Sequence, residues 1–551
     1  MKKSLVAVSV IVALGAAWTG ASWYTGKKIE NHLDSQLAKV NAIIAAQYPK
    51  DGNDLIELQK KDFKRGIFSS NVTFVLNSKG SQDEQKGIIF KSDISHGPFP
   101  VANVVKFKLA PKLAVIHTEL EKNETLKQLF EITKDKSLFT VDTTIGYSKA
   151  LSFGIDLAPV EHKENNTTFG FPGAKIHIDA NNKLDEFSLS IKGGGMAINL
   201  PESKSINSLS LKDIDLSATV HMGKDNRLSK FSSTMKGGEI AFNLPREQTI
   251  SIKNIGSSSD IKRNQFGSYL GNTAYSIGEI NLKGFSSDVK DMSIEGIKSS
   301  TIISEDKNKN INNQSSYGID TVKVNDVDLG SINVGAALNH LDGQAHGQLE
   351  QKLYDFLLQS FKNDKNDIDL LDESIKLNAD ILALLPSLLK HNPQLNMPVS
   401  YKNSKGEGTV NFNFTLNDLP KDPNNFNGIL GNTEKVIRAL SKDMSLDVKL
   451  SESMLVELFS LTSTISGKTD KKAAEENSKK LVNMLLSGFL SENILTKDGD
   501  TIALNFHYDN DKVKFNGKEY SLHQFLLDYG LTGSYDDEQD QYNETELPVA
   551  E

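Results

Sequence analysis

The 11 histidines are the side chains with which this chain could do acid–base or metal chemistry near neutral pH, and they are scattered. His340 and His346 lie six residues apart in a loop-like stretch, which is not the spacing that places two metal ligands on one helix face. His177 and His221 occupy equivalent positions of an internal repeat on expected strands, where a structural or exposed role is typical. We therefore expect neither a metal site nor a bound cofactor.

The remaining motifs also argue against catalysis. Gly193–Gly194–Gly195 is followed by a strand pattern rather than a helix, so it predicts a turn and not a phosphate-binding loop. Asp509–Asn510–Asp511 lacks the continuation of a calcium loop, and no serine nucleophile elbow or metalloprotease helix motif occurs. We expect a protein that is not an enzyme. A hydrolase of envelope polymers stays open, because paired carboxylates can be distant in sequence.

Composition limits the classes of partner. The chain has 551 residues and no cysteine, which removes thiol catalysis and cysteine-based zinc sites and leaves stability to the packed core. The net charge is -9, and seven acidic residues follow Gly533 without any Lys or Arg. The body of the protein is therefore nearly neutral, so we expect no nucleic-acid partner. The segment 534–551 is predicted to be an acidic, disordered tail, with a partner-docking tail as the alternative.

An uncharged, mostly apolar run extends from Ser4 to Tyr24, after Lys2 and Lys3. A helix of this length can cross a hydrocarbon core of ~30 Å. The alternative is a signal peptide cleaved before Ser22, but the run is longer than a usual signal core and ends in aromatic residues typical of a membrane interface. Residues 1–25 are thus predicted to be a transmembrane anchor, for which the representative residues are Leu5, Val12, Trp18, Trp23 and Tyr24.

This anchor predicts a single-pass protein of the bacterial inner membrane. The two N-terminal lysines place the N-terminus in the cytoplasm and the bulk of the chain in the periplasm. Apolar residues recur every three or four positions from Ile29 to Ile44, which predicts that the helix continues to about Gln47 as an amphipathic stalk, residues 26–50.

A stripe of small residues on the anchor is a predicted self-association face, made of Ala13, Ala17 and Ala21 with Gly20 beside them. Such a face permits close approach of two helices in lipid and predicts a homodimer, which the stalk could extend as a coiled coil. The alternative is that alanine is merely common in anchors and that the stalk packs on its own domain.

Beyond the stalk the sequence is β-rich. In residues 51–170, strand patterns at Val72–Leu76, Gly87–Phe90, Val101–Leu109 and Thr140–Ile145 alternate with turns, and Glu119–Thr133 has a helical pattern. Residues 171–330 have almost no helical pattern, and here Ala174–Pro201 and Ala218–Pro245 match at 13 of 28 positions. Each copy reads as three strands, with a glycine turn before the third.

A shorter unit predicts bent strands. Its pattern is apolar-x-apolar, then Lys, Glu or Asn, then Asp, Asn or Gly, then apolar, and the fifth position suits a bulge. The polar segment Ser304–Ser316 is expected to be an exposed hairpin loop. The five copies of the unit are Leu209–Ile214, Ile250–Ile255, Ile280–Phe285, Met292–Ile297 and Val322–Val327.

Residues 331–533 alternate helical and strand patterns, and they include helices near Thr433–Ser441, Ser453–Ser463 and Asp470–Phe489 and a closing hairpin over Thr501–Tyr520. The predicted fold class is therefore α+β and β-rich. It comprises an N-terminal transmembrane helix, an extended antiparallel sheet of repeated strands, and a C-terminal sheet covered by helices.

Two short segments resemble a known family. The run Lys64–Ser70, with Arg65 and Gly66, and the run His96-Gly97-Pro98-Phe99 are similar to signatures of the YdgA-like family. The resemblance covers essentially the whole chain and implies an inner-membrane-anchored bacterial envelope protein of unassigned activity, with no catalytic residues to carry over. More loosely, the repeated strand unit looks like the sheets of AsmA-like proteins, which form grooves that carry lipids.

These observations favour one function and leave an alternative. Many strands with one apolar face and almost no helix to cover it predict a β-groove that handles lipid or another hydrophobic ligand in envelope maintenance. The alternative is a non-catalytic interaction or structural module that self-associates at the inner membrane.

Overall fold

The computed structural model describes residues 2–47, 56–79, 87–201, 203–360, 367–417, 432–465 and 470–531. The chain divides into two compact units, Met1–Asp260 (unit 1) and Ile261–Glu551 (unit 2). The predicted acidic tail, 534–551, lies outside the described residues.

Helix α1 (Lys2–Gln47) is continuous, which confirms the prediction that anchor and stalk form one helix ending near Gln47. Within the part of the chain that the structure describes, no helix combines the length and the apolar character needed to cross a membrane. The side chains of Leu5, Val12 and Ala13, which belong to the predicted anchor and self-association face, lie outside the described residues.

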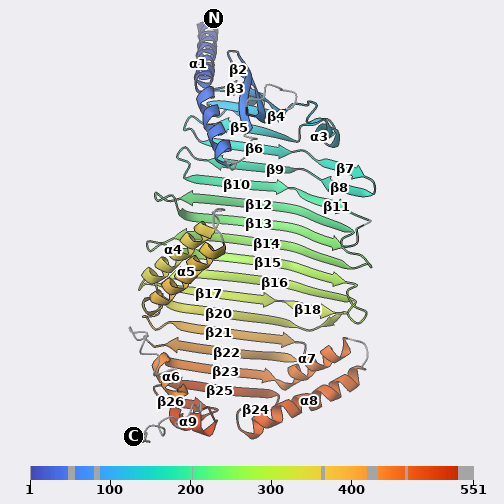
Figure 1. The fold of residues 1–551 in the computed structure, drawn as a ribbon, viewed down its shortest axis with the longest axis vertical. Coiled ribbons are helices and arrows are strands. Elements are labelled where there is room, and N and C mark those ends of the chain that lie inside the picture. The colour runs from blue at the N-terminus through green and yellow to red at the C-terminus, as the bar shows by residue number, and fades with distance from the viewer. Residues whose placement is uncertain are drawn as a thin grey trace, which may run out of the picture. The chain divides into compact units, whose positions relative to one another are not determined.

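Unit 1 is built on antiparallel strands paired in the order β1-β2-β3-β4-β5-β6-β9-β10-β12-β13, and a side ladder of β7, β8 and β11 joins β12. Figure 1 shows these strands lying side by side. The strands are β1 (Ile56–Arg65), β2 (Ser69–Ser78), β3 (Ile88–His96), β4 (Ala114–Leu120), β5 (Phe139–Ile145), β6 (Leu151–Leu157), β7 (Val160–Glu164), β8 (Thr167–Phe171), β9 (Ala174–Ala180), β10 (Glu186–Gly193), β11 (Gly195–Asn199), β12 (Ser208–Met222), β13 (Leu228–Asn243) and β14 (Thr249–Arg263), and the short helices are α2 (Val101–Val104) and α3 (Lys127–Ile132).

Unit 2 has antiparallel strands in the order β15-β16-β17-β20-β21-β22-β23-β25-β26-β27, with β18 paired to β16, β19 to β18 and β24 to β25. The strands are β15 (Tyr269–Lys283), β16 (Asp291–Glu305), β17 (Asn310–Ile319), β18 (Thr321–Val324), β19 (Val327–Asp328), β20 (Ser331–Asp342), β21 (Gln394–Asn403), β22 (Gly406–Leu416), β23 (Ser441–Ser451), β24 (Thr496–Asp498), β25 (Thr501–Asp509), β26 (Lys512–Phe515) and β27 (Lys518–Ser521). The helices are α4 (Gly343–Ser360), α5 (Asp367–Leu388), α6 (Thr433–Leu440), α7 (Glu452–Thr464), α8 (Lys471–Ser491) and α9 (Leu522–Asp528). The predicted β-rich α+β class with a long antiparallel sheet is confirmed.

Three local predictions were wrong. Val101–Leu109 is not a strand but contains α2, because β3 pairs directly with β4 and leaves residues 97–113 as the connection between them. Ser304–Ser316 is not a loop but mostly belongs to β16 and β17, since ladder hydrogen bonds join backbone groups and tolerate polar side chains. The helix expected over Glu119–Thr133 shrinks to α3.

The prediction of a glycine turn in the repeat was also wrong. Strands β10 and β11 both pair antiparallel with β12, at successive parts of its length, so the chain does not reverse at Gly193–Gly195 but makes a kink between two collinear strands. The kink brings the backbone close, because a Cβ on Gly195 would lie 2.4 Å from the Leu211 carbonyl oxygen. In the second copy the equivalent Gly237 lies inside β13.

The bends predicted for the short unit are confirmed inside strands for three copies, in β12, β14 and β16, whereas in the other two the bend lies just after β15 and in the β18–β19 turn. The fifth residue of every copy has a positive φ, which is the left-handed conformation that Asp, Asn and Gly adopt most easily. The five residues and their φ angles are Asp213 (53°), Asn254 (55°), Gly284 (75°), Gly296 (64°) and Asp326 (65°).

We expect Asp213→Val to lower the free energy of unfolding by about 1–3 kcal/mol, because a β-branched residue is strained at this positive φ. Asp213→Gly should be nearly neutral. Urea unfolding followed by far-UV circular dichroism measures both. Asp215→Val, on the same strand at a regular position, is the control for the loss of a carboxylate. Equal effects at 213 and 215 would contradict the strain argument.

Candidate functional site

Helices cover the sheets only locally. Each described cluster of buried hydrophobic residues includes helix residues or lies under a helix, as Val72 and Ile94 do near α1 and Val513 does near α9. Val72 is only 2% exposed, because residues of α1 pack over it. Between Ala180 and the end of unit 1, no hydrophobic side chain among the described residues reaches that degree of burial. That stretch of strands has no second layer.

The uncovered strands of unit 1 have one apolar and one polar face. Cross-strand partners share a face, and the register places Ile155 opposite Ile176, which lies opposite Ile191, which lies opposite Leu216. All are half-buried, because their neighbours on the same face shield only their flanks. We define the open face of unit 1 by the residues Val141, Phe153, Ile155, Ile176, Ile178, Leu189, Ile191 and Leu216.

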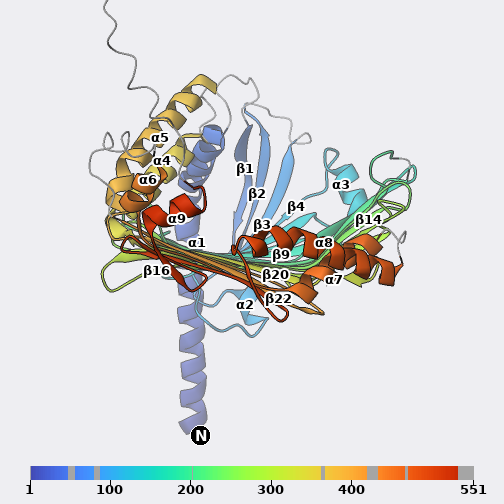
Figure 2. The ribbon, with the colours of Figure 1, turned by 90° about the horizontal axis from the view of Figure 1, so that it is seen from below.

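Unit 2 repeats this arrangement. Figure 2 shows α4, α5, α6 and α9 near one end of its strands and α7 and α8 near the other, all on the same face of the sheet. The predicted covering by helices is therefore confined to the strand ends. Between these helices lies the open face of unit 2, whose register-aligned residues are Tyr317, Val334, Val399, Val410, Val448 and Leu504, flanked by Met397, Phe412 and Leu446.

The opposite faces are polar. In unit 1 the repeat histidines lie there on strands, as expected, with His177 3.2 Å from Asp179 and His221 3.9 Å from Glu186. A cavity of about 760 Å³ on this side is bordered by the β3–β4 connection and by strand ends, and its lining combines polar residues such as Asp179 and Ser188 with apolar ones such as Leu109. Only one face of each sheet thus offers an apolar surface.

The family-signature residues lie at a second site, where α1 meets unit 1. His96 is fully buried at the end of β3, and its Nε2 lies 2.8 Å from Ser70 Oγ while its Nδ1 lies 3.0 Å from the Ile67 carbonyl oxygen. Because a carbonyl only accepts, Nδ1 carries the proton and Nε2 accepts from Ser70 in the neutral ring. Burial lowers the pKa of the His96 imidazole, and the Arg65 charge adds to this, whereas hydrogen bonds to Ile67 and Ser22 oppose it.

Helix α1 packs directly against this histidine. A Cβ on Gly26 would lie 2.4 Å from His96 Cε1, so only glycine permits the approach. Gly97 is equally confined, since its Cβ would lie 2.0 Å from the Lys112 carbonyl oxygen. His96 therefore forms a tight seat for α1 at Gly26, which we call the α1 seat.

Aromatic and charged contacts extend the α1 seat along the helix. Trp18 Nε1 donates to the Phe99 carbonyl oxygen at 3.0 Å, and its ring lies 5.1 Å from that of Phe68. Arg65 Nε lies 2.9 Å from Glu30 Oε2, and the guanidinium lies over the Trp23 ring. The sequence analysis identified Arg65, Gly66, His96, Gly97 and Pro98 as family-signature residues but missed that Arg65 and His96 contact α1. The His96-Gly97-Pro98 run was the available signal in the sequence.

The stalk packs on its own unit, and a coiled coil between two stalks stays a prediction. Ile29 and Leu33 contact the cluster of Val72, Ile94 and Ala114. Further along, the Asn41 side chain accepts from the Leu58 backbone N–H at 2.8 Å and donates to its carbonyl at 2.9 Å. Of the predicted self-association face, Ala17 and Gly20 are exposed and Ala21 is half-buried, and self-association stays a prediction.

One buried polar cluster resembles catalytic machinery in composition only. Ser268 Oγ lies 2.8 Å from His346 Nδ1, and Glu350 Oε1 lies 3.5 Å from the same nitrogen. A catalytic relay needs the serine and the carboxylate on different nitrogens of the histidine ring, whereas both lie nearest Nδ1 here. Ser268 is also fully buried. His340 lies in β20 and His346 in α4, so the loop-like reading of this region was wrong.

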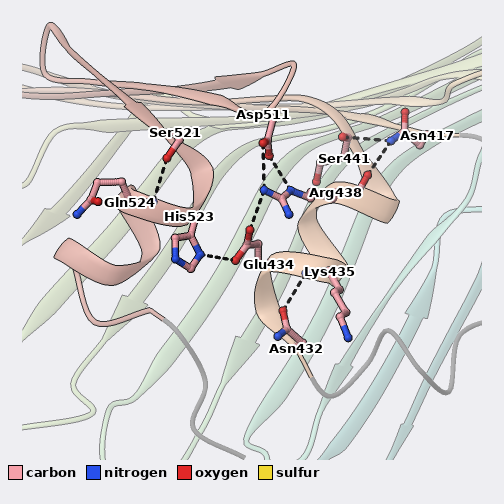
Figure 3. A network of polar contacts seen from close by, with 10 residues as sticks. All are labelled: Asn417, Asn432, Glu434, Lys435, Arg438, Ser441, Asp511, Ser521, His523 and Gln524. Carbon is pink, nitrogen blue, oxygen red and sulfur yellow. Dashed lines mark hydrogen bonds and ion pairs between the residues drawn. The ribbon is translucent and has the colours of Figure 1, made fainter.

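Figure 3 shows a polar network in unit 2 that ties α6 to the C-terminal elements. Arg438 donates to both Asp511 carboxylate oxygens in a bidentate contact, at 2.7 and 3.0 Å, and it also lies 2.7 Å from Glu434. Glu434 Oε2 lies 2.9 Å from His523 Nδ1 on α9. These groups satisfy one another, which indicates a structural role. Among the described residues no group of three or more His, Asp or Glu could hold a metal ion.

The fold and the two sites define a class of β-rich α+β protein in which a long N-terminal helix is seated on an antiparallel sheet with an open apolar face. The sequence matches the family described as "Bacterial protein of unknown function (DUF945)" over residues 1–229 and 224–523, and the chain belongs to this family. The resemblance to YdgA-like proteins is thereby confirmed.

Two relatives span nearly the whole chain. Protein YdgA of Escherichia coli (strain K12) is 27% identical over 543 residues, 96% of either chain. The uncharacterized protein YihF of the same organism is 23% identical over 536 residues, 94% of this chain and 97% of its own. An uncharacterized protein of Haemophilus influenzae is 27% identical over 217 residues, 39% of this chain and 59% of its own. No solved structure matches the chain.

We expect Gly26→Ala to loosen α1 from its seat, because the added methyl group overlaps a histidine that two hydrogen bonds hold in place; the cost should be about 1–3 kcal/mol. The chain's two tryptophans, Trp18 and Trp23, both lie at the α1 seat, so their fluorescence reports on it. Emission should shift to the red. Gly20→Ala is the matched control, since its Cβ would meet nothing within 4 Å. Equal shifts in both variants would contradict the tight seat.

The depressed pKa of His96 predicts a pH dependence at the α1 seat. Its stabilising contribution is complete above the unfolded value of about 6.5 and is lost as the pH falls through the folded pKa, because the unfolded chain then binds the proton more readily. Between about pH 7.5 and about pH 5.5, the wild-type protein should lose more stability than His96→Gln in tryptophan-monitored unfolding. His162→Gln, on the exposed strand β7, should follow the wild type. Parallel curves for His96→Gln and wild type would refute the prediction.

Proposed function

We propose that this protein is a non-catalytic envelope protein that α1 anchors in the bacterial inner membrane. In the periplasm its open faces hold the acyl chains of lipid. The observation that supports the proposal is the missing second layer. A sheet with an apolar face is unstable in water unless something covers that face, and in the described part of the chain helices cover only part of it.

The chemistry of the open faces fits a lipid chain. They are lined by Val, Ile, Leu, Phe and Tyr, and Tyr317 and Met397 on unit 2 are exposed. Neither face presents the convergent polar groups that fix a small polar ligand. The helices that border the open face of unit 2 add exposed apolar residues such as Leu382 on α5 and Met484 on α8. An acyl chain needs length and apolarity rather than specific hydrogen bonds.

A photo-crosslinking experiment tests this in living cells, on the full chain. The photoreactive residue p-benzoyl-phenylalanine replaces Leu189, on the open face of unit 1, or its neighbour Ser190, which points to the polar face. Irradiation should attach radiolabelled phospholipid at 189 and not at 190. In unit 2, Val448 and Asp447 form an independent pair with the same expectation.

The two faces serve as each other's control, because both members of a pair lie on one strand and have the same bilayer tether. Lipid adducts of equal yield on both faces would indicate random contact and contradict the proposal. Absence of adducts at 189 and 448 would contradict it as well. Mass spectrometry of the adduct identifies the lipid class.

The alternative, a self-association module, has one observation in its favour. Ala17 and Gly20 are exposed on α1, whereas Ser22, Thr25 and Gly26 on its other side are buried. Disulfide cross-linking after cysteine substitution at Gly20 tests it directly, because the chain has no cysteine of its own.

A further inference from the structure

The connection between β3 and β4 exposes an unusual set of apolar side chains. Phe107 is 90% exposed, the highest value among the described large hydrophobic residues, and Val105 and Leu109 are 69% and 61% exposed. Phe99 and Val101 are exposed as well. We call residues 99–109 the apolar loop.

The backbone holds the apolar loop in this conformation. The N–H groups of Lys106 and Lys108 both donate to the Asn103 carbonyl oxygen, at 3.0 and 2.9 Å, and the N–H of Phe107 donates to the Val104 carbonyl oxygen. Phe107 itself has a φ of 56°, a strained conformation for an aromatic residue. The strain and the exposure occur at the same residue, which indicates that the loop presents Phe107 outward.

The charged residues of the apolar loop and of its neighbours in sequence have one sign, while Asp179 and Glu186 of the sheet line the same cavity as Lys108 and Lys112. No acidic residue occurs between Asp93 and Glu119, whereas Lys106, Lys108 and Lys112 do. Apolar side chains interleaved with lysines suit the interface of an anionic bilayer, where rings enter the headgroup region and ammonium groups meet phosphates.

The apolar loop also lies at the right height on α1. Trp18 donates to the Phe99 carbonyl oxygen, so the start of the loop is fixed beside residue 18 of the helix. A helix rises 1.5 Å per residue, so a span of about 20 residues that starts at Ser4 ends a little beyond Trp18, and the loop begins near the far end of that span. Figure 2 shows α2 on the same side of the sheet as the N-terminal part of α1.

We infer that the apolar loop inserts into the headgroup region of an anionic phospholipid bilayer and acts as a second membrane contact beside α1. The inference rests on the proposed anchoring by α1. A single helix leaves unit 1 free to rotate about the helix axis, whereas a second contact fixes which way its open face points. The loop, not the open face, is the surface that contacts the bilayer.

Depth-dependent fluorescence tests the inference on the full chain, reconstituted in vesicles of phosphatidylethanolamine and phosphatidylglycerol. Because the chain has no cysteine, Phe107→Cys gives a single site for the environment-sensitive fluorophore NBD. Its emission should shift to the blue and be quenched by lipids spin-labelled near the headgroup. Leu184→Cys, an exposed apolar position in the β9–β10 turn, should keep a water-like emission.

The charges of the loop lysines and of the lipid headgroups provide a second test of the inference. Replacing Lys106 or Lys108 by Gln should weaken insertion about fivefold each, the value expected for one lysine near an anionic surface. Phosphatidylcholine vesicles should reduce the blue shift at Phe107 in the same direction. An insertion that is insensitive to both changes would overturn the anionic-lipid preference.

A label at Val12→Cys separates this inference from the proposed anchor. Lipid-like emission at 12 together with water-like emission at 107 overturns the apolar loop as a membrane contact and leaves the anchor intact. Water-like emission at both positions overturns the anchor and the inference together. Lipid-like emission at both, with Leu184 in water, supports the two contacts.

Discussion

The structure depends on one constraint: an antiparallel sheet with one apolar face needs something to cover that face. Among the described residues, helices cover the sheet of unit 2 only near its strand ends (Figure 2), and in both units side chains under a helix, such as Val72, Ile311 and Ile502, become almost fully buried. The strands between remain half-buried, although their backbone hydrogen bonds are complete with their neighbours. Backbone pairing therefore keeps the sheets together, while much of the hydrophobic surface between the helices stays uncovered.

The α1 seat solves a different problem, how to fix a long helix to a sheet. Neutral His96 fills the space that Gly26 leaves on α1, and Ser70 and Ile67 satisfy both of its ring nitrogens. A buried charge at this position would be costly, which agrees with the lowered pKa of His96. The seat therefore joins the proposed membrane segment to the sheet in a single orientation, and the apolar loop begins beside it.

Much of the local structure could be predicted from sequence. Period-two patterns located β2, β5 and β25, and the short unit predicted the bends at Asp213 and Gly296, where Asp and Gly adopt a positive φ more readily than most residues. The wrong predictions concern segments whose structure depends on strand pairing. The polar residues Asn312–Gln314 pair as part of β17, whereas Val101–Leu109 forms no strand because β3 and β4 pair directly with each other.

The sequence by itself determined the continuous helix α1, the alternation of apolar and polar faces, and membership of the DUF945 family, because these depend on local periodicity and on residue identity. Only the tertiary structure decided that Arg65 and His96 contact α1, and that the helices of unit 2 leave the middle of its strands uncovered. Both depend on contacts between segments far apart in the chain, for which the spacing of residues in the sequence carries no signal.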